Sequence, residues 1–444
     1  MNKVYKRIQK FCEELGFEHT YDTTFARHLS LLEHLTEFLE RKNSNGKLPM
    51  IASACPGWIC YAEKAHGEML PFIARTKSPQ QVMGTLVNEY LAMTWDRKYG
   101  CSFPSYIVRS LISLDCRPDQ IYHVTVMPCY DKKLEASRQD FHNDIYSTRD
   151  VDCVITTGEL EVMMRERGFD LSLPVPGEDS PNVGVEFPEL KIHSGTSSGS
   201  YLHTLINFQM HASPSPLDLS IKTIRSSDYE EYTLKNPCTN EIVFKGAKCY
   251  GFRNLQNIVR KVGREVGVSV GKGAAGRAAG GLRARVKRRT GAEGEGEGKG
   301  LDYVEVMACP GGCINGGGQL KPPSSYRDKD AEGYVRNWNE NGVEMGVEGV
   351  LQNAKWGDKE WTKRVERAYW HDLPTPPSSP KPDGDVADVL ASRILVNLCR
   401  PAVPDATLAW TDTMDAEAES RRRMLFRTEY RAVESEVVGL AVKW

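Results

Sequence analysis

The stretch "DYVEVMACPGGCINGGGQ", Asp302–Gln319, joins a strand-like run to two cysteines set among glycines. Its first six residues are rich in β-branched and aromatic side chains, a composition typical of a short strand. Cys309 and Cys313 follow directly, and the glycines around them leave the backbone bare. This pattern indicates either a loop that holds a metal or cluster, or a plain tight turn with buried cysteines.

Two other cysteines occupy the same kind of position. Cys55 follows the apolar run in "KLPMIASACPGW", and Cys129 follows the run in "QIYHVTVMPCYDKK". In open α/β sheets, ligands bind beyond the carboxyl ends of the strands. We therefore expect these three segments, called here the cysteine loops, to bring four thiols to one point.

Four thiolates at one point suit either a structural zinc ion or a [4Fe–4S] cluster. The spacing lacks the paired C-x2-C of zinc ribbons, which favours the cluster. We further expect Gly311, Gly312 and Gly316 to Gly318 to remove side chains where an inorganic cofactor sits, so that backbone N–H groups approach its sulfides. A zinc site, or no metal, is kept as the alternative.

The chain has 12 cysteines and no secretory leader, so we place it in a reducing compartment, the cytosol or nucleus. For the cysteines in ordinary surroundings we expect buried apolar roles. These are Cys12, Cys101, Cys116, Cys153, Cys238, Cys249 and Cys399.

Composition excludes several classes of protein. The 444 residues are 40% apolar and 26% charged, as in a globular protein, and the net charge is -2. This balance gives no general attraction to nucleic acid or acidic membranes. No apolar run approaches the roughly 20 residues that cross a bilayer. We therefore predict neither a nucleic-acid nor a membrane partner.

Strand-like runs alternate with helical ones after an initial helical region, residues 1–47. This order predicts an α/β fold of two lobes with mostly parallel sheets flanked by helices. We expect a first lobe at 1–200 with the Cys55 and Cys129 loops, and a second at 201–370 with Cys309 and Cys313. The cluster site is expected between the lobes.

Two segments break this pattern. Residues 267–300 are rich in glycine and alanine, basic and then acidic, and predict a disordered surface insertion. Its "RARVKRR" is read as solvated linker charge rather than a nuclear-import or nucleic-acid patch. Residues 371–384 predict a Pro-rich linker, and residues 385–444 a helical segment with a tryptophan tail.

The quoted motifs carry a family resemblance. "SACPGW", "MPCYDKKLEA" and "EVMACPGGCINGGGQ" resemble the three cluster motifs of [FeFe]-hydrogenases. More closely, with "YDTTFARHLSLLEH" and "TKSPQQVMG", they resemble the eukaryotic hydrogenase-like proteins of cytosolic iron–sulfur assembly, the nuclear prelamin A recognition factor-like group. The resemblance covers most of 10–265, 301–320 and the C-terminal end, and it implies the hydrogenase large-subunit fold.

The resemblance implies particular site residues. It assigns the ligation of one [4Fe–4S] cluster to Cys55, Cys129, Cys309 and Cys313. It places Lys132 and Glu135 beside the hydrogenase two-iron subsite, and Met127 and Met307 as apolar neighbours of the cluster.

Three departures from the family pattern stand out. Ala54 occupies the position of the hydrogenase proton-relay cysteine, and a methyl group cannot carry protons. Only Cys12 precedes Cys55, so the family's second, N-terminal cluster is expected to be absent from this chain. Arg431 stands where the family pattern has histidine.

Three hypotheses of function follow. The leading one is a non-catalytic iron–sulfur protein that acts as an adaptor or relay between the cytosolic [4Fe–4S] scaffold and the targeting complex, with Trp444 docking on that complex. The second is an [FeFe]-hydrogenase-type redox enzyme, disfavoured by Ala54. The third is a structural or nuclear interaction protein with zinc or no metal in the cysteine site.

Overall fold

The structure is a computed structural model that describes residues 2–92, 94, 118–179, 187, 195–268, 300–320, 359–371, 382–399, 410 and 414–433. Nearly all of the predicted insertion, most of the predicted linker, Cys101, Cys116 and Trp444 lie outside these residues. Among the described residues, no helix is both long and apolar enough to cross a membrane.

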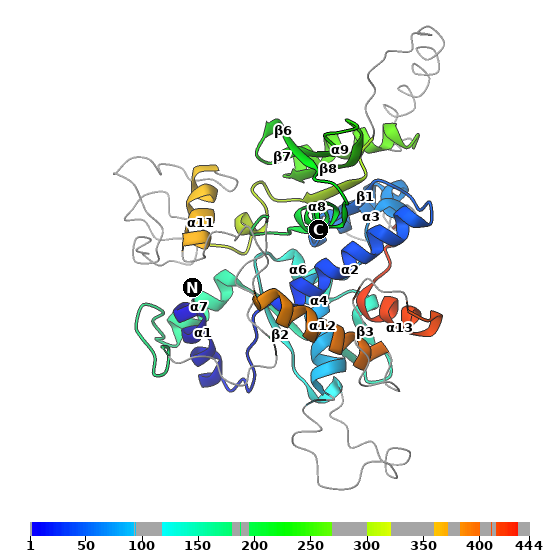
Figure 1. Ribbon diagram of the computed structural model, residues 1–444. Helices are drawn as coiled ribbons and strands as arrows, with labels where there is room; N and C mark the ends of the chain where they lie inside the picture. Colours follow the sequence, from blue (N-terminus) through cyan, green and yellow to red (C-terminus); the bar gives the residue numbers. More distant parts are fainter. Residues whose placement is uncertain are drawn as a thin grey trace. The chain divides into compact units, whose positions relative to one another are not determined.

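Helices and strands alternate along much of the chain (Figure 1). The α-helices are α1 Asn2–Glu14, α2 Thr24–Asn43, α3 Pro56–Ala65, α4 Pro79–Thr85, α6 Asp131–Ala136, α7 Thr157–Glu166, α8 Tyr201–Ala212, α9 Phe252–Glu265, α11 Lys359–His371, α12 Pro382–Cys399 and α13 Ala416–Phe426. The strands are β1 Met50–Ala52, β2 Val124–Met127, β3 His142–Asn143, β4 Thr148–Arg149, β5 Cys153–Thr156, β6 Asp218–Ser226, β7 Tyr229–Lys235, β8 Ile242–Tyr250 and β9 Tyr303–Met307. Short 3₁₀ or π turns are η1 Gly67–Phe72, η2 Leu86–Leu91, η3 Pro118–Gln120, η4 Gln139–Phe141 and η5 Cys313–Asn315.

The chain divides into two compact units, and each is assembled from three separate segments. Unit 1 comprises 1–33, 77–197 and 313–427; unit 2 comprises 34–76, 198–312 and 428–444. This differs from the two consecutive lobes expected from the sequence. The reason lies in strand pairing: β1, near residue 50, pairs with β9, near residue 305, which places Cys55 in the same unit as Cys309.

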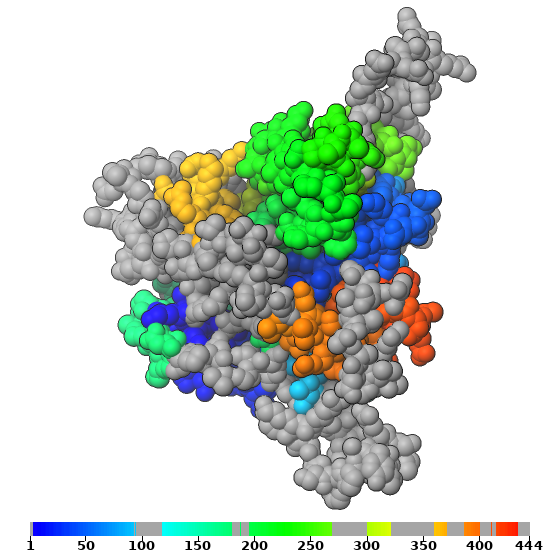
Figure 2. Space-filling model, viewed as in Figure 1, coloured from blue at the N-terminus to red at the C-terminus, as the bar shows by residue number. Residues whose placement is uncertain are grey.

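Unit 2 is built on a five-stranded sheet of order β1-β9-β8-β7-β6. The pairs β1–β9 and β8–β9 are parallel, as expected, whereas β7–β8 and β6–β7 are antiparallel. Two residues connect β6 to β7, which is enough for a hairpin but too short for a parallel crossover. The sheet is therefore mixed, and Figure 2 shows its hairpin end, in green, at the molecular surface.

The core of unit 2 lies around β8 and β9. Every residue of β9 is buried, as in a strand covered on both faces. Helices α8 and α9 pack against β8 and β9 (Figure 1). The rings of Phe244 and Tyr303 both meet that of Phe38 edge-on, with centroids 5.9 and 5.8 Å away. These ring contacts fix the amino end of β9 in the core of unit 2.

Unit 1 contains a two-stranded parallel sheet, β2–β5, and a helical core. Helix α7 begins with a capping box: the Thr156 hydroxyl accepts from the Glu159 N–H, and the Glu159 carboxylate accepts from the Thr156 N–H. The helical core joins α2, α4, η2, α12 and α13 through buried residues such as Leu29, Leu86 and Leu395. These elements position the Cys129 loop at the end of β2.

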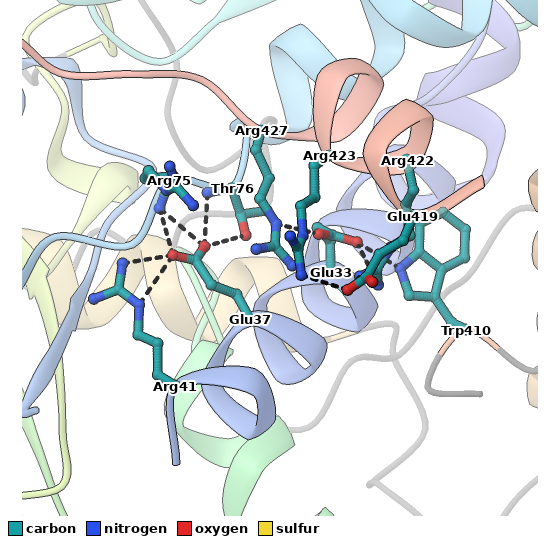
Figure 3. Close-up of polar contacts among 10 residues, drawn as sticks. All are labelled: Glu33, Glu37, Arg41, Arg75, Thr76, Trp410, Glu419, Arg422, Arg423 and Arg427. Atoms are coloured by element: carbon teal, nitrogen blue, oxygen red, sulfur yellow. Dashed lines mark hydrogen bonds and ion pairs between the residues drawn. The ribbon is translucent and has the colours of Figure 1, made fainter. Parts of the chain in front are cut away.

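Helix α2 carries two buried carboxylates one turn apart (Figure 3). In unit 1, Glu33 accepts hydrogen bonds from Trp410 Nε1 at 2.8 Å and Arg427 Nε at 2.5 Å, and Arg422 lies 3.4 Å away. Its 0% exposure makes these cations essential, because an unpaired buried charge is costly. Glu33 thus fastens α13 to α2.

In unit 2, Glu37 accepts from the backbone N–H groups of Arg75 and Thr76, from the Thr76 hydroxyl, and from Arg41 (Figure 3). With all these donors on one carboxylate, the segment before α4 is fixed to α2.

Candidate metal centre

Cys55 and Cys309 follow neighbouring parallel strands of unit 2. The register Ala52↔Glu305 places the ends of β1 and β9 side by side. The Ser53 hydroxyl ties them together, because it donates to the Val306 carbonyl at 2.7 Å and accepts from the Cys55 N–H at 3.0 Å. Cys55 and Cys309 therefore follow the carboxyl ends of two adjacent parallel strands.

Cys55 also begins α3, with Pro56 in the first helical position. Proline is favoured there because its fixed φ suits the helix and the missing N–H has no intrahelical acceptor. Cys55 is buried, and Ala54 beside it is buried as well.

The turn after Cys309 depends on glycine. Gly311 and Gly312 have φ values of 73° and 87°, which side-chain-bearing residues rarely adopt. The Gly312 N–H closes the turn on the Cys309 carbonyl at 3.1 Å, and the Gly311 N–H donates to Asp228 Oδ1 at 2.9 Å. The hairpin turn before β7 thus supports the cysteine turn directly.

Cys129 and Cys313 belong to unit 1. Cys129 follows β2, and its carbonyl accepts from the Lys132 N–H at the start of α6. Cys313 begins η5, and its carbonyl accepts from the Gly316 N–H at 2.9 Å. The two loops touch, because the Gly318 N–H donates to the Pro128 carbonyl at 3.0 Å. Cys129 and Cys313 thus lie in neighbouring loops of unit 1, as Cys55 and Cys309 do in unit 2.

The glycines after Cys313 serve a different purpose from the one expected. A Cβ at Gly316 would lie 2.2 Å from the Pro128 carbonyl oxygen, and one at Gly318 would lie 2.6 Å from the Thr156 side chain. A Cβ on Gly312 would lie 2.1 Å from Ser198 Oγ. Protein atoms fill these spaces, so Gly316 and Gly318 allow the Cys313 loop to pack against the ends of β2 and β5, and Gly312 allows its turn to pack against Ser198.

Lys132, which is buried, and Glu135, which is partly buried, form an ion pair on α6, with Nζ 2.8 Å from Oε2. Ser78 Oγ lies within hydrogen-bond distance of both, and Gln80 Nε2 donates to the Lys132 carbonyl at 3.1 Å. The ammonium group therefore already has a carboxylate and a hydroxyl as partners. This arrangement agrees with a structural role for the lysine.

The two predicted methionines are buried, but in different units. Met127, the last residue of β2, packs with Ala136, Val151 and Val154 in a small core of unit 1. Met307 ends β9 in unit 2, and its Cε would meet a Cβ on Gly199 at 2.9 Å. Both are apolar residues close in sequence to a ligand candidate.

The remaining cysteines divide by burial. Cys249 and Cys399 are buried, and burial raises the pKa of these thiols to about 12 and about 11. They stay protonated at neutral pH and are poor metal ligands. Cys12 and Cys153 are half-buried, and burial raises the pKa of Cys12. Cys238 is exposed, contrary to expectation, because it lies in the turn between β7 and β8.

Sequence reasoning missed the segment "GTSSGS", residues 195–200. Within unit 2, Ser198 lies against Gly312, and Gly199 lies against the buried carboxylate of Glu305. Glu305 accepts from the Leu202 N–H at the start of α8 and from the Tyr250 hydroxyl, both at 2.8 Å. The run of small residues was the available signal, since close backbone approach requires it.

Within each part that the structure describes, no group of three or more histidine, cysteine or acidic side chains gathers around a single metal position. The candidate ligands are instead the two cysteine pairs, Cys55 with Cys309 and Cys129 with Cys313. Both pairs are thiols, the donors that iron–sulfur clusters use.

Comparison with known proteins places this arrangement in a class. Residues 1–317 match the family model of the iron only hydrogenase large subunit, C-terminal domain. A solved [FeFe]-hydrogenase from a study of oxygen inactivation superposes with a TM-score of 0.60 at 22% identity, over 96% of this chain and 88% of that one. A variant of HydA1 from Chlamydomonas reinhardtii gives 0.61 at 21%, over 97% and 88%. The α/β fold of the hydrogenase large subunit is thereby confirmed.

Relatives found by sequence identify the family within the hydrogenase-like proteins. The cytosolic Fe-S cluster assembly factor NAR1 of Cryptococcus neoformans is 42% identical over 99% of this chain and 76% of its own length. The assembly factor narfl of Danio rerio is 36% identical over 100% and 84%. The cytosolic iron-sulfur assembly component 3 of Rattus norvegicus is 36% identical over 99% and 71%. The chain therefore belongs to the family of hydrogenase-like cytosolic Fe–S cluster assembly factors.

Proposed function

We propose that this chain is an iron–sulfur protein of cytosolic Fe–S cluster assembly, and that it performs no catalysis of its own. The family supports the role in assembly, since its named members are cytosolic assembly factors. The observation that carries the proposal for the site is the pair of thiols at neighbouring strand ends, Cys55 and Cys309, matched by Cys129 and Cys313.

We propose that these four cysteines ligate one [4Fe–4S] cluster. The residues fit such a group in two ways. The donor set consists of thiols, and the backbone of each of these cysteines is hydrogen-bonded within its own loop. In addition, the indole N–H of Trp58, on the helix that Cys55 begins, is buried and finds no acceptor within the described residues. A bound cluster supplies redox-active iron and sulfide acceptors.

The absence of catalysis is proposed from Ala54 and Lys132. Ala54 offers no titratable group next to Cys55, and proton transfer requires one within hydrogen-bond reach. Lys132 is engaged with Glu135 and Ser78. We therefore expect no hydrogen evolution from the purified protein after maturation with a two-iron subcluster. Turnover in that assay would favour the hydrogenase alternative.

As partners we propose the [4Fe–4S] scaffold that delivers the cluster and the targeting complex that passes it to apoproteins. Trp444 is the proposed docking residue for the targeting complex. Co-purification of that complex with wild-type protein, and its loss in Trp444→Ala, would support the assignment. Equal recovery of the targeting complex with the wild type and with Trp444→Ala would show that Trp444 is not the docking residue.

The deciding experiment measures iron, acid-labile sulfide and zinc per chain after anaerobic purification. We expect about four irons in the wild type, loss of most iron in Cys55→Ala and Cys309→Ala, and full retention in Cys238→Ala, the matched control in an exposed turn. Zinc in place of iron would support a structural metal site. No metal in any of the proteins would overturn the proposal.

A further inference from the structure

The segment 428–433, called here the strap, follows α13 and lies along α3 and η1 of unit 2. Three backbone N–H groups hold it. Thr428 donates to the Arg75 carbonyl at 2.7 Å, Arg431 to Glu63 Oε1 at 3.0 Å, and Val433 to the Glu63 carbonyl at 3.0 Å. Every one of these acceptors belongs to the segment 34–76 of unit 2.

Shape complementarity adds to these bonds. A Cβ on Gly67 would lie 2.9 Å from the Ala432 Cβ, so glycine at 67 makes room for the strap. The Glu63 carboxylate is buried beneath it. The bond from residue 431 to Glu63 is made by its backbone N–H, and its side chain is exposed.

The strap begins at a fixed point. Arg427, the residue before it, is bonded to the buried Glu33 in unit 1 (Figure 3). From Thr428 to Val433 the chain is then held at three places in six residues. These three hydrogen bonds fix the position of a short segment that is neither helix nor strand.

The helix under the strap is the one that Cys55 begins. Glu63 lies eight residues after Cys55, or about 12 Å along a helix that rises about 1.5 Å per residue. α3 has only ten residues, and so short a helix depends on packing for its stability. Whatever holds its last turn therefore also holds the Cys55 end.

We propose that the strap positions the Cys55 thiol, and that Glu63 and Gly67 are the positioning residues through which it acts. This inference rests on the proposed function, in which Cys55 is a cluster ligand. It makes the C-terminal region part of the metal site. A partner that draws this region away would loosen one of the four ligands.

The first test uses the metal-free protein and iodoacetamide, with modification of each cysteine followed by mass spectrometry. The variants are Glu63→Gln and Gly67→Val. The matched control is Gly300→Val, because a Cβ on Gly300 meets only Glu265, at 3.7 Å. The rate at Cys55 is divided by the rate at the buried Cys249, which reports unfolding of unit 2 as a whole.

We expect the ratio of the two rates to rise in both variants: about tenfold in Gly67→Val, where the strap is forced away, and less in Glu63→Gln, whose amide oxygen still accepts from the Arg431 N–H but without the charge. It should stay unchanged in Gly300→Val. An unchanged ratio in both Glu63→Gln and Gly67→Val would overturn the inference. If a variant only destabilises unit 2 as a whole, Cys55 and Cys249 both react faster by the same factor, and the ratio of their rates does not change.

The second test follows loss of iron to a chelator from the loaded protein. We expect faster loss from Gly67→Val than from wild type or Gly300→Val, and equal rates in all three would contradict the inference. A wild type without iron would refute the proposed function instead. The alkylation ratio would still decide whether the strap positions Cys55.

Discussion

At the residue scale, single side chains and single missing side chains hold the cysteine loops. The clearest case is the glycine run after Cys313. Gly316 and Gly317 are adjacent, yet a Cβ on the first would penetrate the Pro128 carbonyl, whereas one on the second would meet only Tyr130, at 3.9 Å. Position within the turn therefore matters more than glycine content.

This contrast predicts opposite outcomes for two neighbouring substitutions. Gly316→Ala should destabilise unit 1 by roughly 1–3 kcal/mol through overpacking and should lose iron, because the Cys313 loop is pushed from the Cys129 loop. Gly317→Ala should retain both stability and iron. Urea unfolding and iron analysis of the two variants check this, and equal behaviour would contradict the packing argument.

The buried carboxylate of Glu33 gives a second prediction at this scale. Glu33→Gln removes the buried carboxylate that pairs with Arg427 and Arg422, which should cost roughly 3–5 kcal/mol. Glu419→Gln, at the partly exposed rim of the same network, should cost only about 0–1 kcal/mol, because solvent screens its pair with Arg423 and its longer contact with Arg422 at 3.9 Å. Denaturant midpoints of the two variants would test this. A Glu33→Gln protein as stable as Glu419→Gln would show that the buried network is not needed for stability.

At the element scale, α1 is fastened to the rest of unit 1 by a salt bridge. Arg7 donates from Nε to Glu178 Oε2 at 2.8 Å and from its terminal nitrogen to Oε1 at 3.0 Å. Those hydrogen bonds are the main cause that lowers the pKa of Glu178 from 4.5 to about 2. Phe11 of α1 adds an apolar contact with Leu160 and Met164.

The sign of the pH dependence follows from this lowered pKa. The unfolded carboxyl titrates near 4.5 and the folded one near 2, so the bridge contributes fully above about pH 4.5 and is lost as the pH falls toward 2. We expect hydrogen-exchange protection of α1 to decrease over that range. In Glu178→Gln the protection should be lower at neutral pH and should lack this component of the pH dependence.

Local patterns in the sequence predicted most elements but not their partners. The runs that became β1, β2 and β9 were recognisable because each is apolar and ends at a proline or cysteine. The hairpin β6–β7 was missed, because β6 has both faces exposed and so lacks a buried apolar stripe. Loop 198–200 was missed for a related reason: its neighbour Gly312 lies far away in the sequence.

At the scale of the whole molecule, binding of the proposed cluster should add to the stability of the fold. A metal that binds only the folded ligands stabilises the folded state. We expect a higher midpoint of thermal unfolding for the iron-loaded protein than for the metal-free protein. Calorimetry of both forms, with Cys309→Ala as a metal-free reference, is the measurement. Equal midpoints would argue against a metal held by the folded chain.

The division into units could not be predicted from the sequence, although the fold class could. Strands followed by helices indicate an α/β fold wherever they occur. That β1 pairs with β9, rather than with a strand closer in sequence, depends on packing across the whole unit. The site prediction therefore named the four cysteines from their motifs. That Cys55 and Cys309 lie in one unit and Cys129 and Cys313 in the other came from the structure.

Because β1 pairs with β9, the order of synthesis on the ribosome determines when this part of the sheet can form. From Ala52 to Tyr303 there are about 250 residues, and at about 5–20 residues per second their synthesis takes on the order of 10–50 s. Throughout that interval the strand before Cys55 lacks its neighbour, and α13 and the strap emerge later still. In the proposed site, the Cys55 thiol must therefore stay reduced until the strand that precedes Cys309 has been synthesised, because only then can the two cysteines be brought together.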